Sequence, residues 1–198
     1  MIELISRNTS VLPVTLEAAK EHASVTNTID DALIVSYIKS ACRQVEHYCQ
    51  RTIFPASYRL TLQEWPILDK EYRRHIWLQF PAIDQITLFK YVNSAGADVS
   101  MVRNTDYYAS LYGSRPFLKA VSAWPESSLN RYVADPIVIE YTTKAPDVLD
   151  ENLQLAIMML TASFYNNRET FVETRNLLEM PGAAAFTALL GDFKRYIL

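Results

Sequence analysis

The sequence predicts an α+β protein: a helical bundle, formed by N-terminal helices and one long C-terminal helix, with an inserted, mostly antiparallel β-rich subdomain. Helical periodicity marks the first fifty residues and the stretch after residue 146, whereas the middle alternates with period two between prolines. Strands follow one another instead of alternating with helices, which favours antiparallel pairing. We expect one domain over 1–198, with helical parts at 14–51 and 147–190 and the β-rich insertion at 52–146.

The N-terminal part is predicted to form an extended arm up to residue 13 and then two helices. Thr15 can cap a short helix that ends at about Ala23, and a long helix runs from Asp30 or Asp31 to about Gln50. The apolar half of the long helix is formed by Leu33, Ile34, Tyr37, Ile38, Ala41, Val45, Tyr48 and Cys49. Its polar half is formed by Ser36, Lys39, Arg43, Glu46, His47 and Gln50.

Six strand candidates follow in the middle of the chain, punctuated by prolines. Residues 58–63 alternate between apolar and polar side chains, as a half-buried strand does. The sequence Asn-Ser-Ala-Gly at 93–96 predicts a turn, and Trp65 and Trp124, each before a proline, are expected to anchor the core. The other candidates are 76–80, 83–92, 107–109, 117–121 and 137–143.

Residues 147–169 predict a long helix, capped by Asp147, that is apolar on two sides. One stripe is formed by Leu149, Leu153, Ala156, Ile157, Leu160 and Phe164, and a second by Leu155, Met158, Ala162 and Tyr165. A helix that is apolar on two sides must bury both. The second stripe therefore packs either on the helix at 31–50 or on another subunit.

The C-terminal tail, 170–198, combines a mixed segment with a short alanine-rich helix. Pro181 starts this helix, which spans 182–190, and Gly191 ends it. Apolar and aromatic residues continue to the last position of the chain.

Charge and composition exclude several classes of protein. The net charge of −3 argues against a general nucleic-acid binder, which usually carries a strongly basic face. No stretch approaches the length of a membrane span, and the N-terminus lacks the pattern of a signal peptide, so we expect no membrane partner. Cys42 and Cys49 lie too far apart along one helix for a disulfide and are expected to be reduced thiols.

The sequence carries no recognisable catalytic or cofactor motif, and we expect neither an enzyme nor a cofactor. With four glycines, neither a P-loop nor a dinucleotide fingerprint can be written. His47 shares the long helix with both cysteines but points to its polar face, which excludes a zinc site from these three residues. The acidic pairs at 30–31 and 150–151 are interpreted as helix caps.

Arg73-Arg74-His75 is the densest basic run. It could contact phosphate or an acidic neighbouring subunit, or it could be the solvated start of a strand. Arg73 and Arg74 are the candidate residues for contact with DNA or with another subunit.

Several short sequences, in order, resemble the head–tail connector (adaptor, head-completion) proteins of tailed bacteriophages. They are LEAAK at 16–20, DDALI at 30–34, VEHYC at 45–49, WP at 124–125, IVIEYT at 137–142 and the helix from 153 ending in YNNRE at 169. The chain departs from the family pattern at 143–146, Thr-Lys-Ala-Pro, where the family commonly has glycine after the strand.

The resemblance implies a structural virion protein at the head–tail junction, made in the host cytoplasm and assembled as a homo-oligomeric ring, twelvefold in the virion. It implies that the ring lies under the portal protein, extends the DNA channel, meets a tail or stopper protein and touches DNA only transiently. The alternative function is a DNA-packaging or nucleic-acid-binding accessory protein that uses Arg73, Arg74, Lys194 and Arg195.

Two sets of residues are candidates for assembly contacts. Because a ring joins two different patches on each subunit, the first set is a candidate oligomer interface on the long helix: Leu155, Met158, Ala162, Tyr165, Arg168 and Glu169. The second is a candidate portal-docking surface on the C-terminal tail: Pro181, Phe186, Phe193 and Tyr196.

Overall fold

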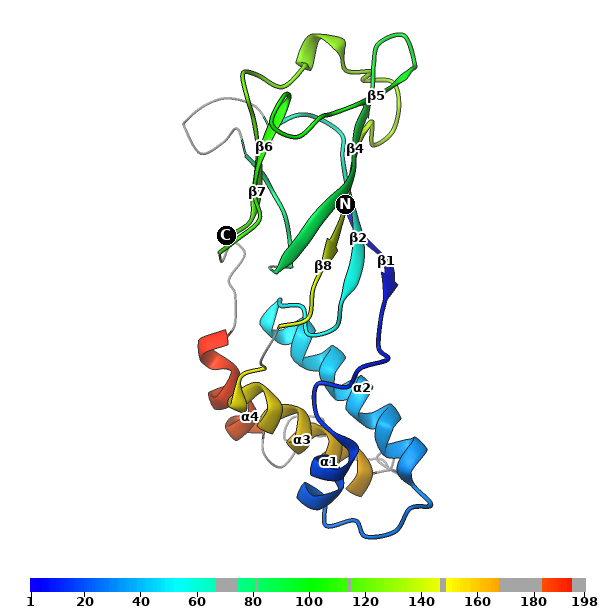
Figure 1. Cartoon of the computed structure of the whole chain (residues 1–198), viewed down its shortest axis with the longest axis vertical. Helices are drawn as coiled ribbons and strands as arrows, with labels where there is room; N and C mark the ends of the chain where they lie inside the picture. Colours follow the sequence, from blue (N-terminus) through cyan, green and yellow to red (C-terminus); the bar gives the residue numbers. More distant parts are fainter. Residues whose placement is uncertain (67–74, 81, 114, 147–148, 168–182, 194–198) are drawn as a thin grey trace, which may run out of the picture. The chain divides into compact units, whose positions relative to one another are not determined.

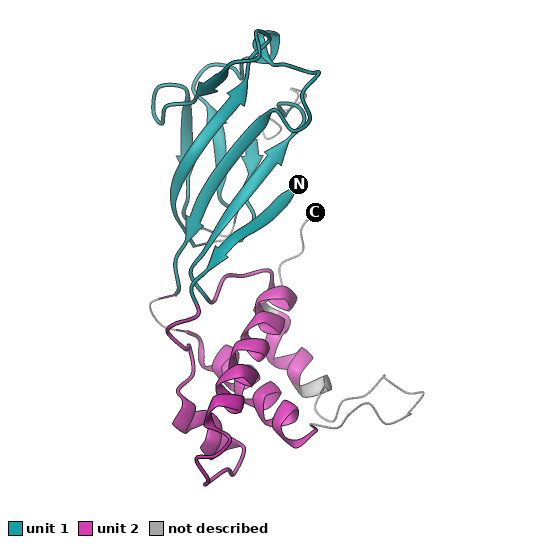
Figure 2. Ribbon diagram, turned by 90° about the vertical axis from the view of Figure 1, so that its right-hand side faces the viewer, with its two compact units in different colours: residues 1–8, 54–145 teal, residues 9–53, 146–198 magenta. Residues whose placement is uncertain are grey.

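The computed structural model describes residues 1–66, 75–80, 82–113, 115–146, 149–167 and 183–193. It divides into two compact units, shown in different colours in Figure 2. The β unit contains residues 1–8 and 54–145, and the helical unit contains residues 9–53 and 146–198. The chain therefore passes between the units after residues 8, 53 and 145.

A five-stranded antiparallel sheet forms one layer of the β unit, in the order β1-β2-β8-β4-β5 (Figure 1). The central ladder joins β2 to β8 without irregularity, from Ala56 opposite Thr143 to Leu62 opposite Ile137. The strands are β1 (Ile2–Arg7), β2 (Ala56–Leu62), β4 (Ile83–Val92), β5 (Asp98–Ser100) and β8 (Ile137–Thr143).

A three-stranded antiparallel sheet, in the order β3-β7-β6, supplies the second layer. Its strands are β3 (His75–Trp77), β6 (Tyr107–Ser110) and β7 (Phe117–Ala120), and a short 3-10 helix η1 (Glu126–Ser128) follows β7. One hydrophobic core collects buried side chains from both sheets, because alternate residues of each strand face the same side.

Aromatic rings dominate this core. The rings of Trp65 and Trp124 stack in parallel with centroids 5.0 Å apart. Tyr91 and Phe89 contact Trp65 from other directions, with centroids at 5.6 and 6.1 Å. Both predicted tryptophan anchors are therefore buried, and they contact each other.

The helical unit consists of α1 (Leu16–His22), α2 (Asp31–Cys49), α3 (Glu151–Asn166), α4 (Ala183–Leu190) and the 3-10 helix η2 (Gly191–Phe193). Helix α3 contacts each of α1, α2 and α4, and α1 also contacts α2. The Thr15 hydroxyl accepts a hydrogen bond from the Ala18 N–H at 3.2 Å, so the predicted cap of the first helix is confirmed.

Helix α2 is amphipathic, as predicted, with two exceptions: Leu33, predicted on the apolar half, is 37% exposed, and Glu46 is buried. Its buried residues recur at helical spacing and include Ile34, Ile38, Ala41 and Val45. Glu46, predicted on the polar face, is buried instead, and its carboxylate accepts a hydrogen bond from the Ile53 N–H at 2.7 Å. The segment that leaves the helix folds back over Glu46, which the helical period could not show.

Three further differences from the sequence prediction concern element boundaries. The N-terminal segment is not an arm: residues 2–7 form β1, an edge strand that pairs with β2. The short strand β5 was not predicted, although the turn that precedes it was; it pairs with the end of β4. Helix α3 begins at Glu151 and is capped by Asp150 rather than Asp147, because the Asp150 carboxylate accepts the Asn152 N–H at 2.9 Å.

Candidate functional site

The two stripes of α3 differ in burial. Leu153, Ala156, Ile157 and Leu160 of the first stripe are buried. In the second stripe, the Leu155 side chain is 36% exposed, and Met158 and Ala162 are half-buried. The helical unit thus leaves part of the second stripe open to a partner.

Tyr165, the last residue of the second stripe, is held inside the helical unit. Its hydroxyl donates a hydrogen bond to Asp30 Oδ2 at 2.8 Å, just before the first turn of α2. Arg168 and Glu169 lie outside the described residues. The part of the candidate interface that the structure leaves accessible is therefore the middle of the helix.

Two residues of the candidate portal-docking tail are in contact with other parts of the helical unit: Phe186 contacts α2, and Phe193 contacts Arg51, two residues after the end of α2. The Phe186 ring meets the Tyr48 ring edge to face, with centroids 5.7 Å apart. The Arg51 guanidinium lies 5.5 Å from the centre of the Phe193 ring. Leu190, at the end of α4, is fully buried, so this part of the tail belongs to the core of the helical unit; Pro181 and Tyr196 lie outside the described residues.

Arg73 and Arg74 also lie outside the described residues. The strand that follows them, β3, forms part of an aromatic surface. Strand alternation places His75 and Trp77 on the face of the three-stranded sheet opposite the buried Ile76. Their cross-strand neighbours are Lys119 and Phe117 on β7. We call this surface the aromatic face; its residues are His75, Trp77, Tyr108, Arg115, Phe117 and Lys119.

The rings of the aromatic face are in mutual contact. His75 stacks on Phe117 with centroids 4.2 Å apart, and Trp77 meets Phe117 edge to face at 5.4 Å. The Arg115 guanidinium lies 6.0 Å from the centre of the Trp77 ring. Burial, together with the neighbouring Lys119 ammonium, lowers the pKa of His75 below its usual 6.5, so this imidazole is neutral at pH 7.

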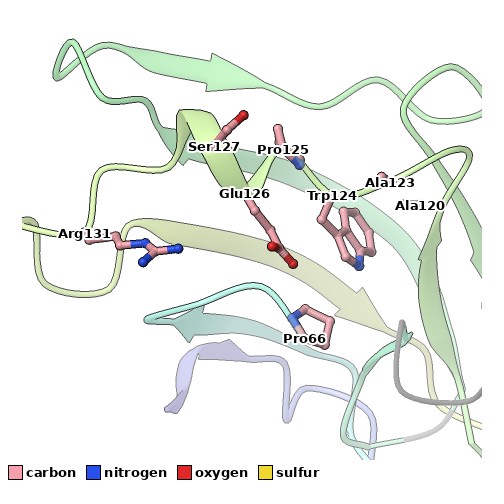
Figure 3. Close-up of a pocket in the computed structure, with 8 residues that line it drawn as sticks. All are labelled: Pro66, Ala120, Ala123, Trp124, Pro125, Glu126, Ser127 and Arg131. Atoms are coloured by element: carbon pink, nitrogen blue, oxygen red, sulfur yellow. The ribbon is translucent and has the colours of Figure 1, made fainter. Parts of the chain in front are cut away.

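A surface pocket of about 440 Å³ lies at the other end of β7, around the start of η1. Pro66, Ala120, Ala123, Trp124 and Pro125 give it an apolar lining, and Glu126, Ser127 and Arg131 line it as well. Figure 3 shows the Glu126 carboxylate directed toward the space between Trp124 and Pro66, with the Arg131 side chain on the opposite side.

Sequence reasoning did not find this pocket, and the sequence holds no signal for it. Its walls come from residue 66 and from 120–131, which meet only because β2 and β7 belong to two sheets of one core. Trp124 was interpreted as a core anchor; it is one, and it also lines the pocket.

The described residues contain no cluster of three or more His, Cys, Asp or Glu side chains that could hold a metal ion. Cys42 and Cys49 are free thiols. Burial, and secondarily the Glu46 carboxylate, raise the pKa of Cys42 to about 12. Burial likewise raises the pKa of Cys49 to about 11, so neither thiol is poised as a nucleophile.

Among the helices that the structure describes, none has the length and apolar character needed to cross a bilayer.

Comparison with known proteins gives one family. The sequence pattern of the phage gp6-like head–tail connector proteins matches residues 13–108, which include α1, α2 and strands β2 to β5. This family is one of structural connectors, not an enzyme family. No curated protein sequence matches the chain.

Solved structures match the fold along the whole chain. A chain from the virion of the native gene transfer agent (GTA) particle has a TM-score of 0.72 at 18% identity, covering 100% of this chain and 97% of that one. A chain from the neck of the empty GTA particle, computed with C6 symmetry, gives 0.71 at 18% with the same coverage. A chain from the neck of the native particle, computed with C12 symmetry, gives 0.69 at 19%, again covering 100% and 97%.

These likenesses establish the α+β fold. The family match covers the segments at 16–20, 30–34 and 45–49, and the resembling segments at 124–125, 137–142 and 153–169 lie outside it. The family match over residues 13–108, together with the fold similarity to chains from the neck and virion of GTA particles, supports a head–tail connector family.

Proposed function

We propose that the protein is a structural component of the head–tail junction of a phage or phage-like particle, where copies of it form a ring beneath the portal. The ring extends the DNA channel and presents a surface to a tail or stopper protein. The observation that carries the proposal is the family match over 13–108, supported by the full-length fold similarity to chains from GTA necks computed with C6 and C12 symmetry.

The proposed ring requires that each subunit present two different complementary patches, because head-to-tail contacts repeat until the ring closes. The accessible part of the α3 stripe, Leu155, Met158 and Ala162, supplies one of these patches. Its side chains are apolar and only partly covered within the helical unit, as expected for residues that a neighbour covers.

Met158→Asp tests this patch. We expect the variant to fold, since Met158 is only half-buried, and to fail in ring assembly, since a carboxylate would be buried without a partner. Gln44→Asp, at an exposed position of α2, is the control for added charge. Rings of normal appearance in negative-stain images of Met158→Asp would exclude the α3 stripe as the interface.

The residues after Phe193 are proposed to dock on the portal. Deleting the whole tail, 170–198, would also remove Leu190 from the helical core, so a cleaner variant ends at Phe193 and keeps α4. We expect this variant to keep its melting temperature and to lose co-sedimentation with the cognate portal. Tyr196→Ala should also weaken portal binding. Unchanged portal binding in both variants would rule out this tail as the docking surface.

The rival function, a DNA-packaging or nucleic-acid-binding accessory protein, makes a different prediction. It requires that the isolated protein bind duplex DNA with a strong salt dependence and that Arg73→Ala/Arg74→Ala remove the binding. A conduit for DNA avoids tight phosphate contacts, so our proposal predicts weak binding that this double substitution hardly changes. Filter binding at two salt concentrations distinguishes the two functions.

A further inference from the structure

The aromatic face is exposed although its side chains are large and apolar. Trp77 is 43% exposed and Tyr108 is 53% exposed, whereas the residues that precede them on the same strands, Ile76 and Tyr107, are buried. Side chains on the inner face of this sheet are buried in the core of the β unit, whereas Trp77 and Tyr108 on the outer face are exposed. Contiguous exposed apolar surface of this kind marks interaction sites.

The face is also pre-arranged for binding. The His75–Phe117 stack, the Trp77–Phe117 contact and Arg115 over Trp77 hold these side chains in a fixed geometry. Ordered side chains lose little conformational freedom when a partner binds. Tryptophan, tyrosine and arginine are also the residues that most often dominate binding energy at protein–protein contacts.

Charge decides what kind of partner fits. Arg115 and Lys119 are cationic, and the described residues of β3, β6 and β7 include no aspartate or glutamate. The chain as a whole carries a net charge of −3, so the aromatic face is a cationic area on an acidic molecule. It is therefore complementary to the surface of another copy of the same chain.

Duplex DNA fits the face less well. Binding to DNA depends on many cations that neutralise successive phosphates, whereas this face carries two, and its imidazole is held neutral. Exposed indole and phenol rings can donate single hydrogen bonds to phosphate oxygens, but they neutralise no phosphate charge.

We propose that the aromatic face binds an acidic surface of the neighbouring copy in the ring, as a contact additional to the one made by the α3 stripe. The proposal rests on the ring assembly proposed above, but it assigns the contact to the outer face of β3-β7-β6, a surface separate from the α3 stripe.

The test pairs two double variants of the full chain. Trp77→Ala/Lys119→Glu changes the aromatic face, whereas Tyr132→Ala/Lys144→Glu makes the same kinds of change at exposed positions elsewhere in the β unit. Sedimentation velocity over a concentration series measures self-association. We expect the first variant to associate at least about tenfold more weakly than wild type and the second to match wild type. Added salt should weaken wild-type association.

A photo-crosslinker at Tyr108, in a mixture of isotopically light and heavy chains, identifies the partner directly. Mixed light–heavy products would support the contact between copies. Products with another class of molecule only, or a wild-type chain that stays monomeric throughout, would overturn it. Normal rings from Trp77→Ala/Lys119→Glu would also overturn it while leaving the proposed ring function intact. Rings absent from wild type and strong DNA binding would instead count against the proposed function.

Discussion

The two units form their cores from different kinds of side chain. The β unit packs aromatic rings between two sheets, with Trp65, Trp124, Phe89 and Tyr91 in mutual contact. The helical unit packs aliphatic residues and two thiols, such as Ile38, Cys42 and Ile157, along helix faces. Sheets about 10 Å apart leave room for rings, whereas closely packed helices favour smaller side chains.

This difference provides a separate probe for each unit. All three tryptophans lie in the β unit and both cysteines lie in the helical unit. Indole fluorescence therefore reports on the β unit alone, and the rate of thiol labelling reports on the helical unit alone. Each prediction below uses one probe as signal and the other as an internal reference.

The largest effect is expected from Trp65→Ala. Trp65 is 2% exposed and stacks on Trp124, so its loss leaves a cavity and should lower the free energy of unfolding of the β unit by ~3–5 kcal/mol. Urea unfolding followed by fluorescence of the remaining tryptophans measures it. Tyr132→Ala, at a fully exposed ring, should have no effect. Equal losses by fluorescence and by thiol labelling would show that the units unfold as one.

Ile38→Ala applies the same change to the helical unit. Ile38 is completely buried between α2 and its neighbours, and we expect a loss of ~2–5 kcal/mol in the free energy of unfolding. Labelling of Cys42 and Cys49 under native conditions should become faster. Leu33→Ala, on the exposed part of the same helix, is the matched control, and a Leu33→Ala effect as large as that of Ile38→Ala would contradict the packing described above.

Alkaline pH should weaken the helical unit first, because the usual pKa of a thiol, 9.0, lies below that of the buried tyrosines in the β unit, 10.0. The pKa of Cys42 is raised from 9.0 to about 12 in the folded chain, so between these values the unfolded chain loses a proton that the folded chain keeps. The stabilisation is complete below pH 9 and is lost as pH rises, by up to about 1.4 kcal/mol per pH unit. Helical-unit stability measured at several pH values checks the slope. Cys42→Ala should make the slope shallower without removing it, because the pKa of Cys49 is raised as well; an unchanged slope would assign it to other groups.

The smallest effect is expected from Thr15→Ala. This change removes the hydroxyl that accepts the Ala18 N–H at the start of α1, and helix caps of this kind contribute about 1 kcal/mol. Because α1 contacts both α2 and α3, thiol labelling should accelerate slightly while tryptophan fluorescence stays unchanged. Thr15→Ser keeps the hydroxyl and should restore the wild-type rate; a Ser variant as weak as Ala would remove the capping explanation.

Local pattern predicted the elements that carry strong local signals. The strands β4 and β8 have the predicted bounds, 83–92 and 137–143, because each is rich in β-branched and aromatic residues and Pro81 or Pro136 comes shortly before it. The helix cap at Thr15 and the turn at 93–96 were predicted because their side chains form hydrogen bonds with nearby backbone.

Features that depend on distant partners were not predicted. Strand β1 is short and lies at a sheet edge, and its partner β2 comes more than 45 residues later, so nothing near it in sequence indicates pairing. The helical pattern placed Glu46 on the surface, but in the structure the chain around Ile53 covers it. The aromatic face could be predicted only with the register of β3 against β7, because alternation alone does not say which side of a strand is covered.

The three passages of the chain between the units have a consequence for synthesis. Strand β1 leaves the ribosome first, but the bond between the Met1 amino group and the Thr61 carbonyl spans 60 residues and must wait for β2. The Arg59–Glu140 bond, which spans 81 residues, must wait for β8, and α3 follows later still. Neither unit can be completed until these later elements have left the ribosome, so we expect folding at the slow rates typical of non-local contacts.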